Sequence, residues 1–146
     1  MRKIIAILAI LVFSITACRY EEGPFLTVYT PEQRLIRTWT LQGMEKNGKE
    51  VTSSIWTANK IGAYYYFAAY GNLIVTTIVN GELREGYTGS WTFQNNSKEL
   101  KLDFFLIDVH YTYTARIKKL TTTELIYEYT DVNGDKWRLQ MYAQGN

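Results

Sequence analysis

The feature that most restricts the fold of this chain is a repeated alternation of apolar and polar residues, interrupted by short turns. Leu100, Leu102 and Phe104 alternate with charged side chains, which is the period-two pattern of a half-buried strand. Similar runs are joined by turn signals typical of tight hairpins. These include Asn47-Gly48, Asn80-Gly81 and Asn133-Gly134. No stretch after Trp39 has the period of a helix long enough to connect parallel strands, so the pattern predicts an all-β, antiparallel fold.

About eight such strands follow Trp39, and most of them are joined by tight turns. Consecutive hairpins most simply form an up-and-down meander, in which each strand pairs with the next one along the chain. Closing this meander into an eight-stranded barrel removes the exposed edges that favour aggregation. The interior of such a barrel is either filled by side chains or just wide enough for one small ligand. An open two-sheet sandwich is the alternative.

A short helix is expected before the first strand. Thr30 suits an N-cap, Pro31 suits the first helical position, and Gln33 completes a capping box. The pattern predicts that this helix ends near Ile36 and closes one end of the sheet structure.

The amino terminus has the parts of a secretory signal peptide. Arg2 and Lys3 precede an apolar run from Ile4 to Ile15, and small residues follow that run. As a helix the run would span roughly 18 Å, which is too short for a hydrocarbon core about 30 Å thick. We therefore expect a removable export peptide of residues 1–17 rather than a permanent transmembrane anchor.

Ile15-Thr16-Ala17-Cys18 resembles the bacterial lipobox. The resemblance implies transfer of a diacylglycerol to the Cys18 thiol, cleavage before this residue and acylation of the new amino terminus. Two or three acyl chains at ~0.8 kcal/mol per buried CH₂ anchor a protein durably. The alternative is an ordinary cysteine, which as the only one in the chain could form only an intermolecular disulfide. Lipidation divides the chain into a signal peptide (1–17), a lipidated flexible tether (18–30) and a barrel domain (31–146).

The segment after the cysteine, Arg19-Tyr20-Glu21-Glu22, resembles the surface-export signals of lipoproteins in the Bacteroidetes group. The resemblance implies an outer-membrane lipoprotein of the cell envelope that faces either the periplasm or the cell surface. A plain solvated tether is the alternative.

The net charge of the chain belongs to the export peptide. Removing residues 1–17 takes Arg2 and Lys3 from the 16 basic side chains and none of the 14 acidic ones, which leaves 14 of each. A neutral domain without a basic stripe argues against nucleic acid as a partner, because nucleic-acid binding depends on neutralising phosphates. The mature chain has no cysteine pair, so its stability must come from packing.

The segment Leu35-Ile36-Arg37-Thr38-Trp39, followed by a strand, an Asn-Gly turn and further hairpins, resembles the lipocalin-like domains of Bacteroidetes lipoproteins over residues 31–143. It is more distantly similar to the lipocalins, where a Gly-x-Trp motif opens the first strand. The Trp of that motif packs at the closed end of the barrel beneath a late basic side chain. The resemblance implies that Trp39 takes this structural position under Arg138 through a cation–π contact, although Arg37 stands where the glycine is expected.

Candidate catalytic and metal-binding groups are few. His110 is the single histidine and follows Asp108 by two residues, so on a strand the two side chains share a face. Such a pair could act as a general base or as half of a metal site, but no second histidine or free thiol completes a zinc site. An outward-facing polar pair is therefore favoured. The chain also lacks a Gly-x-Ser-x-Gly elbow, so we predict no enzymatic activity, no metal and no cofactor.

Aromatic side chains remain as candidates for ligand binding. They are expected on inward faces at Tyr64, Tyr66, Trp91, Phe93, Tyr111, Tyr113 and Tyr127. Tyrosines combine an apolar ring with a polar tip, which suits a small apolar or amphipathic ligand. The alternative is that these rings only fill the core, and that the outer surface of a structural or interaction lipoprotein contacts another envelope protein.

Overall fold

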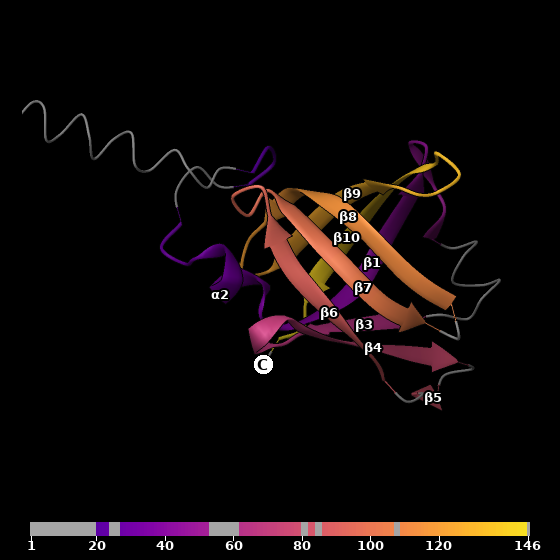
Figure 1. The fold of residues 1–146 in the computed structure, drawn as a ribbon, viewed down its shortest axis with the longest axis horizontal. Coiled ribbons are helices and arrows are strands. Elements are labelled where there is room, and N and C mark those ends of the chain that lie inside the picture. Colours follow the sequence, from indigo (N-terminus) through magenta and orange to yellow (C-terminus); the bar gives the residue numbers. More distant parts are fainter. Residues whose placement is uncertain are drawn as a thin grey trace, which may run out of the picture.

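The structure, a computed structural model, describes residues 20–23, 27–52, 62–79, 82–83, 86–106 and 109–145. The predicted export peptide, Cys18, Asp108 and the Asn80-Gly81 turn lie outside the described residues. The described chain forms a closed antiparallel β-barrel preceded by a short helix (Figure 1).

Eight long strands form the wall of the barrel within the described residues. They are β1 (Thr38–Lys46), β3 (Gly62–Phe67), β4 (Asn72–Val79), β6 (Tyr87–Gln94), β7 (Glu99–Leu106), β8 (Val109–Leu120), β9 (Glu124–Thr130) and β10 (Lys136–Ala143). Each long strand pairs with the next along the chain, and β10 pairs with β1 to close the wall. Two short strands, β2 (Lys49–Glu50) and β5 (Glu82–Leu83), pair with β1 and β4. The predicted eight-stranded up-and-down barrel is confirmed.

Two β-bulges change which residues of a strand face inward. In β1 the register with β10 shifts between Leu41 and Gly43, and Met44 then packs against the core. In β8 a second shift follows Ile117 and brings Leu120 into the core. The simple alternation expected for these strands therefore holds only up to each bulge, because a bulge adds one unpaired residue and reverses the phase.

Helix α2 (Pro31–Leu35) covers one end of the barrel, which we call the closed end. The Thr30 hydroxyl accepts the Gln33 N–H and the Gln33 side chain accepts the Thr30 N–H, so the predicted capping box is present. Leu35 and Trp39 are fully buried, and the Trp39 indole N–H donates to the Leu35 carbonyl at 2.9 Å. Among the described residues no helix is long and apolar enough to cross a membrane.

The basic side chain over Trp39 is Arg37, which corrects the role implied for Arg138. The guanidinium carbon of Arg37 lies 5.9 Å from the centre of the Trp39 ring, within the range of a cation–π contact. Arg138 precedes the buried Leu139, so alternation directs its side chain to the outer wall. There its Nη1 lies 2.7 Å from the Glu128 carboxylate, and it cannot cover an interior ring.

Residues 20–23 lie against the barrel, which differs from the flexible tether expected for residues 18–30. Tyr20 is 4% exposed and belongs to the core cluster. The N–H of Glu22 donates to the Lys118 carbonyl at 2.8 Å. The segment docks because the Tyr20 ring packs against the hydrophobic core and because Glu21 and Glu22 pair with basic residues of the barrel wall. These basic residues lie far away in the sequence.

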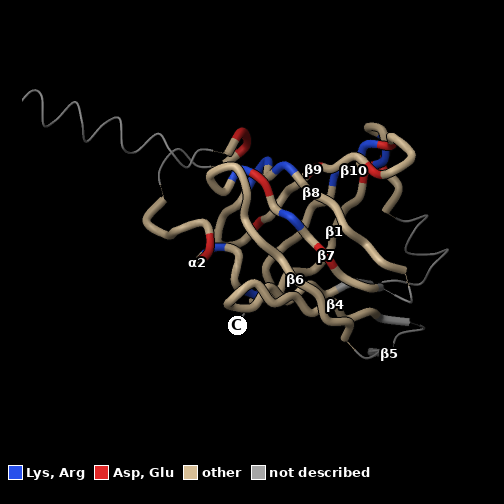
Figure 2. Tube along the Cα trace, viewed as in Figure 1, with Lys and Arg blue, Asp and Glu red and all other residues tan. Residues whose placement is uncertain are grey.

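Charged residues are unevenly distributed around the wall. β3, β4 and β6 contain no Lys, Arg, Asp or Glu, whereas β1 and β7 to β10 carry charges (Figure 2). On the uncharged side Tyr66 and Ile74 pair in register and are 43% and 36% exposed. The barrel thus has one charged and one uncharged outer side.

Replacing Gly89 by Ala is expected to destabilise the barrel by about 1–3 kcal/mol, the usual range for overpacking. A Cβ atom at Gly89 would lie 2.4 Å from the Asp103 carbonyl oxygen and 2.5 Å from the Phe104 Cβ, so β6 and β7 would have to separate. Urea unfolding followed by circular dichroism measures the change. Gly43→Ala is the matched control, since its nearest new contact would be 3.6 Å away at the end of the Gln140 side chain. Equal stability of the two variants would contradict the expected clash.

Candidate ligand-binding site

The end of the barrel opposite α2, which we call the far end, has a different lining from the closed end. The turn of residues 47–48 and the hairpin of residues 131–135 lie at this end, as do the start of β8 and the end of β9 (Figure 1). Tyr111 and Tyr129 face inward near these strand ends. The interior therefore changes from aliphatic side chains and the Trp39 indole at α2 to phenol rings and the Trp137 indole at the far end.

Five inward tyrosines form what we call the tyrosine cluster: Tyr65 of β3, Tyr111 and Tyr113 of β8, and Tyr127 and Tyr129 of β9. In the strand order β3 lies across the barrel from β8 and β9, so the cluster spans the interior. The rings of Tyr113 and Tyr129 stack with centroids 3.9 Å apart. Tyr111 stacks at 5.3 Å on Phe104, and Tyr65 meets the same ring edge-on at 6.0 Å. Aromatic contacts of this kind hold the phenol rings in defined positions.

The hydroxyl groups of the cluster differ in how they are satisfied. The Tyr113 and Tyr127 hydroxyls lie 3.1 Å apart and share a hydrogen bond. No protein partner is seen for the hydroxyls of Tyr65, Tyr111 and Tyr129 among the described residues. Polar groups inside a barrel are expected to be hydrogen-bonded, so these three phenols offer free donors and acceptors to a bound molecule or to water.

Burial raises the pKa of the phenols at these positions: Tyr65, Tyr113, Tyr127 and Tyr129. The neighbouring phenols raise the pKa of Tyr65 further, since a phenolate would form beside other oxygen atoms. The phenols are therefore neutral at physiological pH, and each can donate one hydrogen bond as well as accept others.

Thr77 adds an unsatisfied hydroxyl to the same interior. It is fully buried, and its Oγ1 has no hydrogen-bond partner among the residues that the structure describes. On β4 it is the next inward residue after Val75, which pairs in register with Tyr65. An unpaired buried hydroxyl costs about 1–3 kcal/mol. An interior water or a polar ligand group would satisfy it.

Five of the seven predicted ligand-binding residues face the interior of the barrel, and they form two groups. Tyr111, Tyr113 and Tyr127 face the interior as expected and belong to the tyrosine cluster. Trp91 and Phe93 also face inward, and their rings lie 5.5 Å apart in edge contact. They lie away from the cluster, because the Trp91 indole donates at 3.0 Å to the Ala68 carbonyl beyond the closed-end terminus of β3.

The inward orientation expected for Tyr64 and Tyr66 is wrong. The buried residues of β3 are Tyr65 and Phe67, so Tyr64 and Tyr66 share the other face and Tyr66 is 43% exposed. Aromatic residues occupy four consecutive positions here, so alternation alone could not distinguish the faces. A signal was present in β4, where the fully buried Leu73 and Val75 pair in register with Phe67 and Tyr65.

The candidate general base is exposed and lies outside the barrel. His110 Nε2 is 3.0 Å from Asp103 Oδ1, with both side chains 46% exposed, and its ring stacks on Phe105 at 4.7 Å. Its expected partner, Asp108, lies outside the described residues. No group of three or more His, Cys, Asp or Glu side chains suited to a metal is found in the described part of the chain. The outward-facing polar position favoured for His110 is confirmed.

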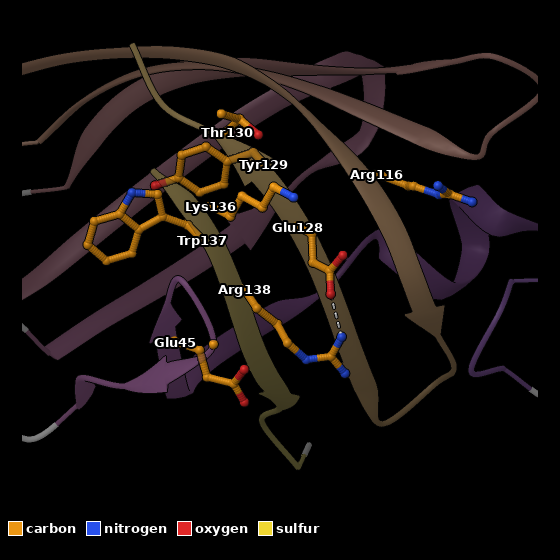
Figure 3. Close-up of a pocket in the computed structure, with 9 residues that line it drawn as sticks. Glu45, Arg116, Glu128, Tyr129, Thr130, Lys136, Trp137 and Arg138 are labelled. Atoms are coloured by element: carbon orange, nitrogen blue, oxygen red, sulfur yellow. Dashed lines mark hydrogen bonds and ion pairs between the residues drawn. The ribbon is translucent and has the colours of Figure 1, made fainter. Parts of the chain in front are cut away.

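A groove of about 370 Å³ crosses the outer wall over β1 and β8 to β10 (Figure 3). Its floor is a row of cross-strand partners with alternating charge, which we call the charge ladder: Glu45, Arg138, Glu128 and Arg116. Opposite charges in register stabilise neighbouring strands. Within this ladder Arg138 pairs with Glu128 at 2.7 Å. A groove floored by charged side chains is unsuited to an apolar ligand.

A second groove, of about 560 Å³, lies at the closed end and is lined in part by Arg37, Tyr66 and Thr122. The Arg37 guanidinium donates to the Thr122 carbonyl and, at 3.2 Å, to the Gln33 carbonyl. Its hydrogen-bonding groups thus hold the end of the barrel together. The tyrosine cluster remains the best candidate for a ligand site.

Comparison with family models gave no match, and comparison with curated proteins gave none either. Among solved structures, a redesigned β-barrel is similar to this chain with a TM-score of 0.51 and 14% identity, over 82% of this chain and 100% of that one. A lipocalin-like protein from Bacteroides uniformis ATCC 8492 has a TM-score of 0.49 and 11% identity, over 77% of this chain and 99% of that one. At such identities the likeness concerns the fold alone. The chain is a closed, eight-stranded antiparallel β-barrel.

Removing one hydroxyl of the Tyr113–Tyr127 pair is expected to destabilise the protein more than removing both. Tyr113→Phe leaves the fully buried Tyr127 hydroxyl without a partner, at a cost of about 1–3 kcal/mol. The double variant that also carries Tyr127→Phe leaves no unpaired hydroxyl of this pair, so it should recover part of the lost free energy of unfolding. Denaturant unfolding measures the free energies, with Tyr70→Phe, which is 97% exposed, as the control. Strictly additive losses would contradict a hydrogen-bonded pair.

Proposed function

We propose that this chain is a non-enzymatic, lipid-anchored lipoprotein of the outer membrane whose barrel binds one small amphipathic molecule. The observation that carries the proposal is the set of three inward phenols, Tyr65, Tyr111 and Tyr129, whose hydroxyls have no protein partner within the part of the chain that the structure describes. An apolar enclosure with a few convergent polar groups is the usual form of a small-molecule site.

The cluster also limits the chemistry of the ligand. The cluster contains no acidic or basic side chain, and burial raises the pKa of Tyr65 and Tyr129, so these phenols offer no charge to a ligand. A charged ligand group buried among them would lose its hydration without gaining a counter-ion. The favoured ligand is therefore uncharged, with a flat apolar body and a few hydrogen-bonding groups in reach of the phenols and of Thr77.

Anchoring is proposed from the sequence. The apolar run that ends at Ile15 and the lipobox-like segment that ends at Cys18 support export and acylation. The acids that follow, Glu21 and Glu22, support sorting to the outer membrane, facing the periplasm or the cell surface. The His110–Asp103 pair is half-exposed on the outer wall, which supports a binding role rather than hydrolysis.

Ligand binding is tested with the full chain purified from membranes in mild detergent. Native mass spectrometry should detect a retained small molecule, and the neutral dye Nile red should bind with increased fluorescence. Tyr65→Phe and Tyr129→Phe should each weaken dye binding about 2- to 10-fold, the effect of one lost hydrogen bond. Tyr70→Phe is the matched control, because this ring is 97% exposed. A chain without any retained molecule, with dye binding unaffected by the cluster variants, would contradict the proposal.

The lipid anchor is tested by Cys18→Ser in a bacterium that processes lipoproteins. The unmodified chain should fractionate with membranes and carry the mass of two or three acyl chains, since several chains are needed for durable attachment. The variant should lose this mass and leave the outer-membrane fraction. Equal membrane association of both forms would contradict anchoring through Cys18.

A second candidate function, a structural or interaction lipoprotein, is favoured by the uncharged outer side. β3, β4 and β6 present no charged residue to solvent, and depletion of charge is typical of the centre of protein interfaces. Under this alternative the tyrosine cluster is core packing and the exposed Tyr66 and Ile74 contact another envelope protein. Isolation of the chain without a retained small molecule would favour it.

A further inference from the structure

The segment Tyr20–Gly23, which we call the strap, is held on the barrel by its tyrosine. The Tyr20 hydroxyl donates at 2.9 Å to the Ser97 carbonyl in the turn between β6 and β7. The guanidinium carbon of Arg34, in α2, lies 5.4 Å from the centre of the Tyr20 ring. With 4% of its surface exposed, Tyr20 is a buried part of the closed end rather than a passing contact.

The two acids of the strap pair with basic residues of the outer wall. Glu21 forms ion pairs with Arg116 and Lys118, and Glu22 lies 2.6 Å from Arg138. Arg116 and Arg138 are the basic members of the charge ladder, so the strap supplies these arginines with further carboxylates. Together with the backbone hydrogen bond from Glu22 to Lys118 at 2.8 Å, these contacts fix the strap along β8 and β10.

These charges persist at neutral pH. The hydrogen bond from Lys118 lowers the pKa of Glu21 below its usual value of 4.5, and the hydrogen bond from Arg138 does the same for Glu22. Glu128 also forms ion pairs with Lys118 and Arg138, and so competes with Glu21 and Glu22 for these two basic side chains. A group whose pKa falls on docking favours the docked form above its free pKa, so docking weakens only as the pH falls below about 4.5.

The strap leaves little free chain before the predicted lipid. Cys18 stands two positions before Tyr20, and two residues span at most roughly 7 Å. Acyl chains on Cys18 would therefore enter the bilayer beside the closed end, next to α2 and the turn that contains Ser97. The far end, with Tyr111 and Tyr129, lies on the opposite side of the barrel.

The charge of the closed end suits a lipid surface. Arg34 and Arg37 have no carboxylate partner among the described residues, and their guanidinium groups are held by carbonyls such as those of Leu120 and Thr122. Lys98, in the turn beside Tyr20, is exposed. Arg34 is only 2% exposed and lies against the Tyr20 ring, so the cations that can reach lipid phosphates are the partly buried Arg37 and the exposed Lys98.

We propose that the docked strap turns the lipid anchor into an orienting device, which holds the closed end of the barrel against the lipid headgroups and points the tyrosine-lined far end into the aqueous phase. This inference rests on the lipid anchoring proposed above. It adds a property to the binding function: the ligand enters from solution and not from the bilayer to which the protein is attached.

The orientation is tested with the lipidated full chain in vesicles of phosphatidylcholine and phosphatidylglycerol. A nitrobenzoxadiazole label is placed through Gln94→Cys at the closed end, where Gln94 is exposed and uncharged, or through Val132→Cys at the far end, where Val132 is fully exposed. A nitroxide on the lipid headgroups should quench the label at position 94 several-fold more than the label at position 132. The unmodified chain shows at the same time whether Cys18 carries acyl chains, because a free thiol would take up the label.

The role of the strap is tested by combining Glu21→Gln and Glu22→Gln in each labelled chain. Loss of the ion pairs should free the strap and reduce the difference in quenching between the two positions. Glu32→Gln is the matched control, since Glu32 lies at the same end and forms no ion pair within the described chain. An acylated, vesicle-bound chain with equal quenching at both positions, or a double variant that keeps the full difference, would overturn the inference. A chain without acyl chains would instead overturn the anchoring on which it rests.

Discussion

The pairing of β1 with β10 is the contact on which the rest of the structure depends. Strands at the two ends of the barrel domain meet along seven residue pairs, from Trp39 with Ala143 to Lys46 with Trp137. Without this seam the meander would be an open sheet with two exposed edges. With the seam closed, the inward faces of all eight strands point at a common axis, and side chains from opposite walls come into contact. The tyrosine cluster exists only because β3 is thereby brought across from β8 and β9.

Closure also gives the barrel two different ends and two different sides. α2, Leu35 and Trp39 fill one end, where the Trp39 indole is satisfied by the backbone. The other end gathers phenols whose hydroxyls are only partly satisfied by one another. On the outside, the charge ladder gives β1 and β8 to β10 a surface that can receive the acidic strap. The proposed ligand site and the proposed membrane attachment thus lie at opposite ends of the barrel.

The predictions from the sequence succeeded where the signal was local. The capping box of Thr30 and Gln33 is present because it involves residues three positions apart. The strand of Leu100, Leu102 and Phe104 faces inward as expected because polar residues alternate with it clearly. Tyr111, Tyr113 and Tyr127 were found in the same way, whereas Tyr65 was missed because its neighbours on both sides are also aromatic. The predicted contact between Arg138 and Trp39 was wrong, because Arg138 faces outward and forms ion pairs with acidic residues. A sequence pattern does not show which charged residues will pair.

The sequence by itself determined the class of this protein: antiparallel strands, tight turns, one capped helical turn and a lipobox-like cysteine. Each of these depends on side-chain period or backbone conformation within a few residues. Only the tertiary structure decided which tyrosine rings lie together, which basic side chain covers Trp39, and whether the strap (Tyr20–Gly23) is free or docked on the barrel. Those outcomes depend on contacts such as that between Tyr20 and Ser97, which are 77 positions apart. They form only when barrel closure has brought distant strands together, since burial and ion pairing act through space.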